Sequence, residues 1–331
     1  MNDEVVPERR LAWVQLSEGE EINITWPEKP MRREVWEEFT SVIQLVADIR
    51  PLVVDLLGLE MDFAELMQVE GQIVESMRTL NAWQNAGSRG AVTLARSQSK
   101  LTAFLGAASA FRDHIVATLS GASDVAEDAV KSFKSATSAE FDSSQAYRIM
   151  YGLRNFAQHE DAPLSAVPVS GKRSGAEDWA YRVELVLHIQ RLADSDKFNS
   201  KVRQEMQTLP DKVPLMPLVK EFMASHRRLA GWMLKRHERQ ISAVKHYQQA
   251  VLSHPHRPTG SIPVMVEGPS MHLGQLDEHN RNYSYFGFDE VALIDRLLER
   301  LETPEPAILT VQALLDLTEP AGLGPDAERS V

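Results

Sequence analysis

The side chains best suited to chemistry in this sequence lie at positions 154 to 159, where an arginine precedes a histidine by five positions. Arg154 carries a permanent charge on a planar fork that matches the oxygens of a phosphate. His159 can take up and release a proton near neutral pH. Asn155, between them, has an amide that can orient a ligand. A guanidinium and an imidazole on one helix are suited to binding and cleaving a phosphodiester.

The helix that carries these residues is predicted to begin near Asp142, because an aspartate followed by Gln145 three positions later is typical of an N-cap. At about 100° per residue, this helix has one apolar side. The apolar side comprises Ala146, Ile149, Met150, Leu153, Phe156 and Ala157. The opposite side, an arc of roughly 140°, comprises Tyr147, Tyr151, Arg154, Asn155, Gln158 and His159. We predict catalytic roles for Arg154 and His159, and supporting or substrate-binding roles for the other four.

The segment YRIMYGLRNFAQHED, residues 147–161, resembles the motif helix of the HEPN superfamily. The signature of that superfamily is an arginine and a histidine separated by four to six residues, the first of which is usually polar, such as asparagine, within a helical bundle. Arg154, Asn155 and His159 match it, and Tyr147 and Tyr151 precede them. The resemblance covers at most residues 34–161. The resemblance does not extend to the rest of the chain.

The resemblance implies a metal-independent endoribonuclease, commonly a toxin or an antiviral defence effector, that acts as a homodimer with one composite site. His159 would remove a proton from a ribose 2′-hydroxyl or protonate the leaving oxygen. Arg154 would stabilise charge on the phosphate, and Asn155 would orient either group. RNA is then the substrate, no cofactor is needed, and an antitoxin or a defence-system protein is an expected partner.

Two alternatives remain open. In the first, Arg154 pairs with Glu160 or Asp161 and His159 caps the helix end, so that the segment is structural or belongs to a degenerate, inactive HEPN bundle. In the second, the chain is a non-catalytic helical adaptor whose acidic N-terminal arm and basic helix bind protein partners.

Composition excludes several other classes of function. The chain has 331 residues, a formal net charge of -12 and no cysteine, so disulfides, thiolate zinc sites and a cysteine nucleophile are excluded. Nucleotide-binding glycine loops and the serine-hydrolase elbow are absent. The histidines at 226, 237, 246, 254 and 256 do not have metal-ligand spacing, so no metal site is predicted. No stretch reaches the roughly 18 apolar residues of a membrane span, and we expect a cytoplasmic protein without a membrane partner.

Charge is distributed unevenly along the chain. Residues 1–75 hold 17 acidic and 6 basic side chains, whereas residues 197–245 hold 11 basic and 4 acidic ones. The basic segment is either a phosphate-facing surface or a solvated face that complements the acidic segment. The residues that would face RNA are Arg227, Arg228, Lys235 and Arg236.

Hydrophobic periodicity predicts a mainly α protein, a helical bundle with small β-hairpin insertions and a long basic C-terminal helix. The resemblance implies that this bundle is HEPN-like. Helices are expected at 34–57, 60–84, 88–120, 123–137, 142–160, 195–208, 214–253, 289–302 and 307–318. Strands are expected at 11–16, 22–26, 164–169, 179–189, 262–267 and 283–288. The predicted segments are an N-terminal arm or small hairpin (1–33), the bundle (34–161), a β-hairpin insertion (162–192), a basic helical extension (193–257), a C-terminal α/β segment (258–318) and a flexible tail (319–331).

Overall fold

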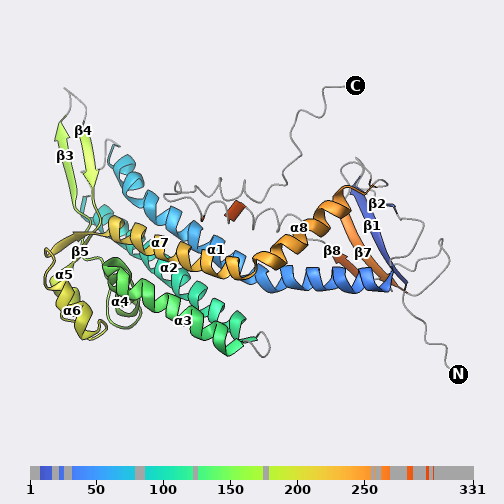
Figure 1. Ribbon diagram of the computed structural model, residues 1–331. Coiled ribbons are helices and arrows are strands. Elements are labelled where there is room, and N and C mark those ends of the chain that lie inside the picture. The colour runs from blue at the N-terminus through green and yellow to red at the C-terminus, as the bar shows by residue number, and fades with distance from the viewer. Residues whose placement is uncertain are drawn as a thin grey trace. The chain divides into compact units, whose positions relative to one another are not determined.

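The computed structural model describes residues 8–16, 22–25, 32–78, 86–121, 126–173, 179–254, 257, 262–268, 282–285, 296–297 and 301, and these are mainly helical (Figure 1). The chain forms two compact units. The first comprises Met1–Arg50, Lys235–Arg296 and Thr318–Val331, and the second comprises Pro51–Leu234 and Leu297–Leu317. Each unit is described by itself. The predicted helices at 289–302 and 307–318 lie almost wholly outside the described residues, as does the tail.

In the first unit, four described strands form an antiparallel sheet in the order β2 (Ile22–Thr25), β1 (Glu8–Leu16), β7 (Ile262–Gly268) and β8 (Asn282–Tyr285). Trp13 lies opposite Thr25 on one side and Pro263 on the other. Its ring is fully buried, and its centroid lies 4.9 Å from that of His254, which follows α8 (Glu238–Leu252). The N-terminal hairpin and the two later strands were predicted, but their union in one sheet was not.

The first long helix, α1 (Arg33–Met77), passes through Gly58 without a break. The predicted end at residue 57 is therefore wrong. A glycine inside a helix costs about 1 kcal/mol relative to alanine, but Leu56, Leu59 and Phe63 on either side of it are buried. Packing of this apolar face outweighs the local preference of glycine. Pro51, also inside α1, marks the boundary between the two units.

The second unit is a bundle of α2 (Ala86–Gly121), α3 (Ala126–Ser143), α4 (Gln145–His159), α7 (Leu215–Arg236) and the second half of α1. Aromatic rings from α1, α2 and α7 pack together in the core of this bundle. The Phe104 centroid on α2 lies 6.0 Å from that of Phe63 on α1 and 5.9 Å from that of Phe222 on α7. α2 contacts both α3 and α4, which also contact each other. This packing positions α4.

Shorter elements complete the second unit. β3 (Val169–Arg173) and β4 (Trp179–Val183) form a hairpin, and β5 (Val186–His188) pairs with β6 (Lys212–Pro214). α5 (Ile189–Ala193) and α6 (Ser200–Met206) pack together and α6 contacts α4. The predicted helix over 214–253 is divided at His237 into α7 and α8. None of the helices described is both long and apolar enough to cross a bilayer.

Candidate functional site

Ser144 is the N-cap of α4, not Asp142 as the sequence predicted. The Ser144 hydroxyl accepts a hydrogen bond from the backbone N–H of Tyr147 at 3.0 Å, as an N-cap side chain does. It also donates to Oε1 of Glu221 on α7 at 2.5 Å. One side chain therefore begins α4 and ties its first turn to α7.

Arg148 and Gly152 hold α4 against its neighbours, and neither role was predicted. The Arg148 Nη1 donates to the carbonyls of Phe141 and Asp142 at 2.7 and 2.9 Å, so it caps the last turn of α3. Its Nε donates to Glu205 on α6 at 2.8 Å. At Gly152, a Cβ atom would lie 2.3 Å from Cδ1 of Phe198. Only glycine permits this approach.

The apolar side of α4 is buried as predicted, apart from Ala157, which is half-buried. Ile149, Met150, Leu153 and Phe156 are at most 1% exposed. Tyr147, which was predicted to lie on the open side, is also buried, at 1%. Its ring stacks on His226 of α7 at 5.6 Å and 23°. The expectation was wrong because α2 and α7 cover a wider arc of α4 than its apolar residues indicate.

The remaining predicted residues form the open face of α4, which comprises Tyr151, Arg154, Asn155, Gln158 and His159. Tyr151, Gln158 and His159 are exposed, while Arg154 and Asn155 are half-buried. This face is therefore accessible and not packed beneath the β3–β4 hairpin.

Arg154 and His159 both retain unused hydrogen-bonding capacity. The Arg154 Nη1 donates to Oδ1 of Asn155 at 3.2 Å. Its Nε is buried and has no acceptor. The His159 imidazole has no hydrogen bond or ion pair with any residue that the structure describes. Neither side chain forms an ion pair with a described residue, and the His159 imidazole is exposed.

The carboxylates that were considered as partners of Arg154 are engaged elsewhere. Asp161 forms an ion pair with Arg191 on α5, and Glu160 accepts a hydrogen bond from Ser195. The Arg191 guanidinium carbon also lies 5.6 Å above the Phe156 ring. The structural alternative in which Arg154 pairs with Glu160 or Asp161 is therefore wrong.

Helix geometry separates Arg154 from His159. Five residues correspond to about 140° around the axis and about 7.5 Å along it. The two side chains thus lie on opposite flanks of the open face, with Tyr151 and Gln158 between them. Each can contact an extended ligand laid across the face, but they do not contact each other.

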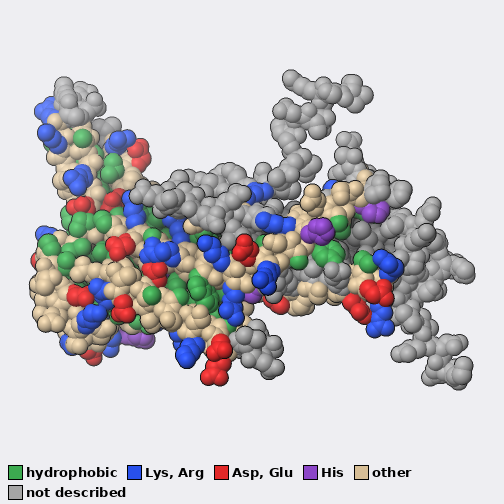
Figure 2. All heavy atoms as spheres, in the orientation of Figure 1, with side chains coloured by type: hydrophobic (Ala, Val, Ile, Leu, Met, Phe, Trp, Pro, Cys, Tyr) green, Lys and Arg blue, Asp and Glu red, His purple; other side chains and the backbone are tan. Residues whose placement is uncertain are grey.

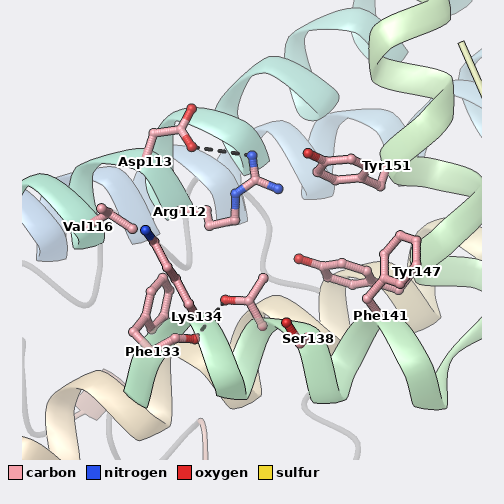
Figure 3. A pocket seen from close by; sticks show the side chains of 10 residues that line it. Arg112, Asp113, Val116, Phe133, Lys134, Ser138, Phe141, Tyr147 and Tyr151 are labelled. Atoms are coloured by element: carbon pink, nitrogen blue, oxygen red, sulfur yellow. Dashed lines mark hydrogen bonds and ion pairs between the residues drawn. The ribbon is translucent and has the colours of Figure 1, made fainter. Parts of the chain in front are cut away.

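A cavity of about 660 Å³ lies between α2, α3 and α4, and we call it the α2–α4 cavity (Figure 3). Its lining comprises Arg112, Asp113, Val116, Phe133, Lys134, Thr137, Ser138, Phe141, Tyr147 and Tyr151. The sequence singled out only the two tyrosines. A smaller hollow of about 290 Å³ lies on the other side of Tyr151, beside Asn155 and Phe198. Neither Arg154 nor His159 lines either space.

The surroundings of Arg112 in the α2–α4 cavity keep its guanidinium positively charged. Burial acts to lower the pKa of Arg112, but Tyr147, Tyr151 and Asp113 together raise that pKa above its ordinary value. The Arg112 guanidinium carbon lies 4.9 Å above the Tyr151 ring. Burial raises the pKa of Tyr147, and Arg112 opposes this rise. Arg112 thus remains charged, and Tyr147 remains a neutral donor.

The basic residues predicted to face RNA have different environments. Arg227 is engaged inside the bundle, because its Nε and Nη2 each donate to Glu60 at 2.7 Å and Glu60 is 1% exposed. For Arg227, the prediction is wrong. Arg228 binds Glu140 through two hydrogen bonds of 2.8 and 2.6 Å, and Lys235 and Arg236 are exposed. On the face drawn in Figure 2, basic and acidic side chains are interspersed.

Among the described residues, no group of three or more histidine, aspartate or glutamate side chains could hold a metal ion. Comparison of the chain with known proteins gives no match to a family model, a curated protein or a solved structure.

Proposed function

We propose that this chain is an endoribonuclease of the HEPN type that binds and cleaves RNA on the open face of α4, as a toxin or defence effector. Arg154 binds a backbone phosphate, and His159 transfers a proton at the bond that is cut. Asn155, Tyr151 and Gln158 orient the strand.

The observation that carries this proposal is the state of two side chains on one accessible helix. The half-buried Arg154 forms one hydrogen bond, to Asn155, and no ion pair with a described residue, so its charge is available to a phosphate. His159 is exposed and unpaired among the described residues. An RNA strand laid across the face would contact a cation on one flank and a proton carrier on the other.

The proposed reaction is transesterification. The ribose 2′-oxygen attacks phosphorus and loses its proton to a base, while the bond to the 5′-oxygen breaks and that oxygen gains a proton. The products are a 2′,3′-cyclic phosphate and a 5′-hydroxyl. Because one imidazole serves one of these two proton transfers at a time, a homodimer in which two α4 helices face each other would supply both.

The test is cleavage of single-stranded RNA by the purified protein in the presence of a chelator. His159→Ala is expected to lower the rate by roughly 10²–10⁴-fold, and Arg154→Ala by roughly 10²–10³-fold. His246→Ala is the matched control, because His246 is also exposed on a helix but lies on α8. Products with 2′,3′-cyclic phosphate ends support the mechanism. A rate that is equal in the wild type and in His159→Ala refutes it.

A non-catalytic adaptor is the second candidate, and one observation favours it. Arg154 and His159 lie about 140° apart on α4 and line neither the α2–α4 cavity nor the hollow beside Asn155. This candidate requires that Arg154→Ala and His159→Ala retain full cellular activity. It also requires that charge reversal at Lys235 and Arg236, both exposed, abolish capture of a protein partner.

A further inference from the structure

We propose that the α2–α4 cavity is a binding site for an aromatic monocarboxylate, a small molecule with one carboxylate and an apolar ring. Its volume of about 660 Å³ lies within the range of about 300–1,000 Å³ that is usual for small-molecule sites. Neither Arg154 nor His159 lines this space, so the assignment is independent of the proposed ribonuclease activity.

A buried hydroxyl without an acceptor points to a ligand. Tyr147 is 1% exposed, and its hydroxyl has no hydrogen-bond partner of normal geometry among the described residues. Arg112 is close enough to oppose the rise of the Tyr147 pKa, but a guanidinium has only donors and cannot accept the O–H. Figure 3 shows this hydroxyl and that of Tyr151 pointing toward the space beside Arg112. A ligand oxygen in this space would accept the Tyr147 proton and relieve the cost of burying a lone donor.

Arg112 supplies the fork that binds a carboxylate. Its guanidinium carbon lies 4.9 Å above the Tyr151 ring, so that one face of the fork is covered. Among the described residues, Asp113 is the only carboxylate that Arg112 contacts, through one long hydrogen bond of 3.3 Å. The Asp113 side chain is 60% exposed, which makes this a weak pair. A guanidinium has five N–H groups in a planar arrangement that matches a carboxylate, so donors remain for a ligand.

The charge of the lining favours a monoanion. Arg112 on α2 and Lys134 on α3 are the cations among the ten lining residues, and Asp113 is the only carboxylate. The exposed Lys134 ammonium forms no ion pair with a described residue. The lining therefore has one net positive charge, which a single carboxylate neutralises. A phosphate monoester carries about -1.5 to -2 near neutral pH, and its excess charge would remain uncompensated beside Asp113.

The rest of the wall is apolar and mainly aromatic. Phe141 lies edge-to-face with Tyr147 and Tyr151, at centroid distances of 6.5 and 6.1 Å, and Phe133 and Val116 form another part of the lining. A carboxylate without an apolar body would leave this surface in contact with water. Aromatic rings pack favourably edge-to-face or offset against other rings. A ring joined to the carboxylate therefore satisfies both parts of the cavity.

The test is isothermal titration calorimetry of the full chain with phenylacetate and matched ligands. Phenylacetamide has the same shape but no charge, and phenyl phosphate has the same ring but nearly two negative charges. Phenylacetate should bind about tenfold or more tightly than phenylacetamide, because it forms charge-assisted hydrogen bonds. Equal binding of phenylacetamide overturns the role of the carboxylate. Tighter binding of phenyl phosphate overturns the assignment of a monoanion.

Two other acids test the ring wall. Acetate has no apolar body and should bind more weakly than phenylacetate. Cyclohexylacetate has a ring of the same size that is not aromatic, and it should bind about twofold to tenfold more weakly. Equal binding of acetate overturns the role of the apolar wall, and equal binding of cyclohexylacetate overturns the preference for an aromatic ring.

Substitutions assign the binding to individual groups. Tyr147→Phe is expected to weaken phenylacetate binding about tenfold or more, since it removes a hydrogen bond to a charged group. Arg112→Lys keeps the charge but removes the planar fork, and a similar loss is expected. Tyr181→Phe is the matched control, because Tyr181 lies on β4 and does not line the cavity. It should leave the affinity unchanged.

Folding and catalysis are controlled separately. Lys134 is exposed, so Lys134→Ala tests the site even if a buried variant were to unfold, and it should weaken binding about twofold to fivefold. Lys220→Ala, an exposed lysine of α7 outside the lining, should not. Circular dichroism verifies every variant, and His159→Ala should bind phenylacetate as the wild type does. Absence of binding at millimolar phenylacetate, or binding that none of the cavity variants weakens, overturns the proposal.

Discussion

Lowering the pH from about 7.5 to about 5 is expected to cost the second unit about 2 kcal/mol of unfolding free energy through one residue, His226. This side chain is 2% exposed and lies in the core beneath Tyr147. Burial lowers the pKa of His226 from 6.5 to about 4. The Arg112 charge lowers it too, whereas Glu140 and the carbonyls of Phe222 and Ala108 oppose the shift.

The sign follows from proton uptake by the two states. Above pH 6.5 the ring is neutral in both the folded and the unfolded chain, so it contributes no pH dependence. As the pH falls below 6.5, the unfolded chain takes up a proton that the folded chain refuses until about pH 4. With these two pKa values, the loss integrates to about 2 kcal/mol at pH 5 and about 3 kcal/mol at pH 4.

The measurement is urea unfolding of wild type and His226→Phe at about pH 7.5 and about pH 5, followed by circular dichroism with linear extrapolation. Phenylalanine keeps a ring beside Tyr147 but cannot titrate. The difference between the two proteins isolates His226, since all other titrating groups are shared. Hydrogen exchange of peptides from α4 and α7 assigns the transition to the second unit.

Phe111→Leu is the matched control, because the Phe111 ring lies 6.5 Å from that of His226 and has no proton to exchange. It should destabilise the unit to the same extent at both pH values. The reasoning is refuted if wild type and His226→Phe lose the same stability between the two pH values. That result would mean that His226 is hydrated or protonated in the folded state.

Three substitutions test the contacts that position α4 and the bundle. Gly152→Ala is expected to cost about 1–3 kcal/mol by overpacking against Phe198, and urea unfolding should show partial recovery when Phe198→Leu is added. Glu60→Gln is expected to cost roughly 3–5 kcal/mol, because it leaves Arg227, whose side chain is 11% exposed, without its anion. The double variant Glu60→Gln/Arg227→Met should be more stable than Glu60→Gln alone. Ser144→Ala is expected to cost about 1 kcal/mol and to speed amide exchange in the first turn of α4.

Local sequence signals predicted the apolar side of α4 because its period is a property of a short segment, although they placed the N-cap at Asp142 instead of Ser144. The burial of Ile149, Leu153 and Phe156 follows from 3.6-residue periodicity alone. The position of Tyr147 did not follow, because periodicity ranks the sides of a helix but does not say how much of its circumference neighbouring helices cover. The width of the buried arc is set by α2 and α7, which are distant in sequence.

Non-local contacts explain the other differences. Arg227 and Glu60 are 167 positions apart, so a count of basic residues between 197 and 245 could not show that one of them is neutralised inside the bundle. The same holds for β1 and β7, whose pairing joins residues 8–14 to residues 262–268. Alternation identifies each strand, but it contains no information about which strand lies beside it.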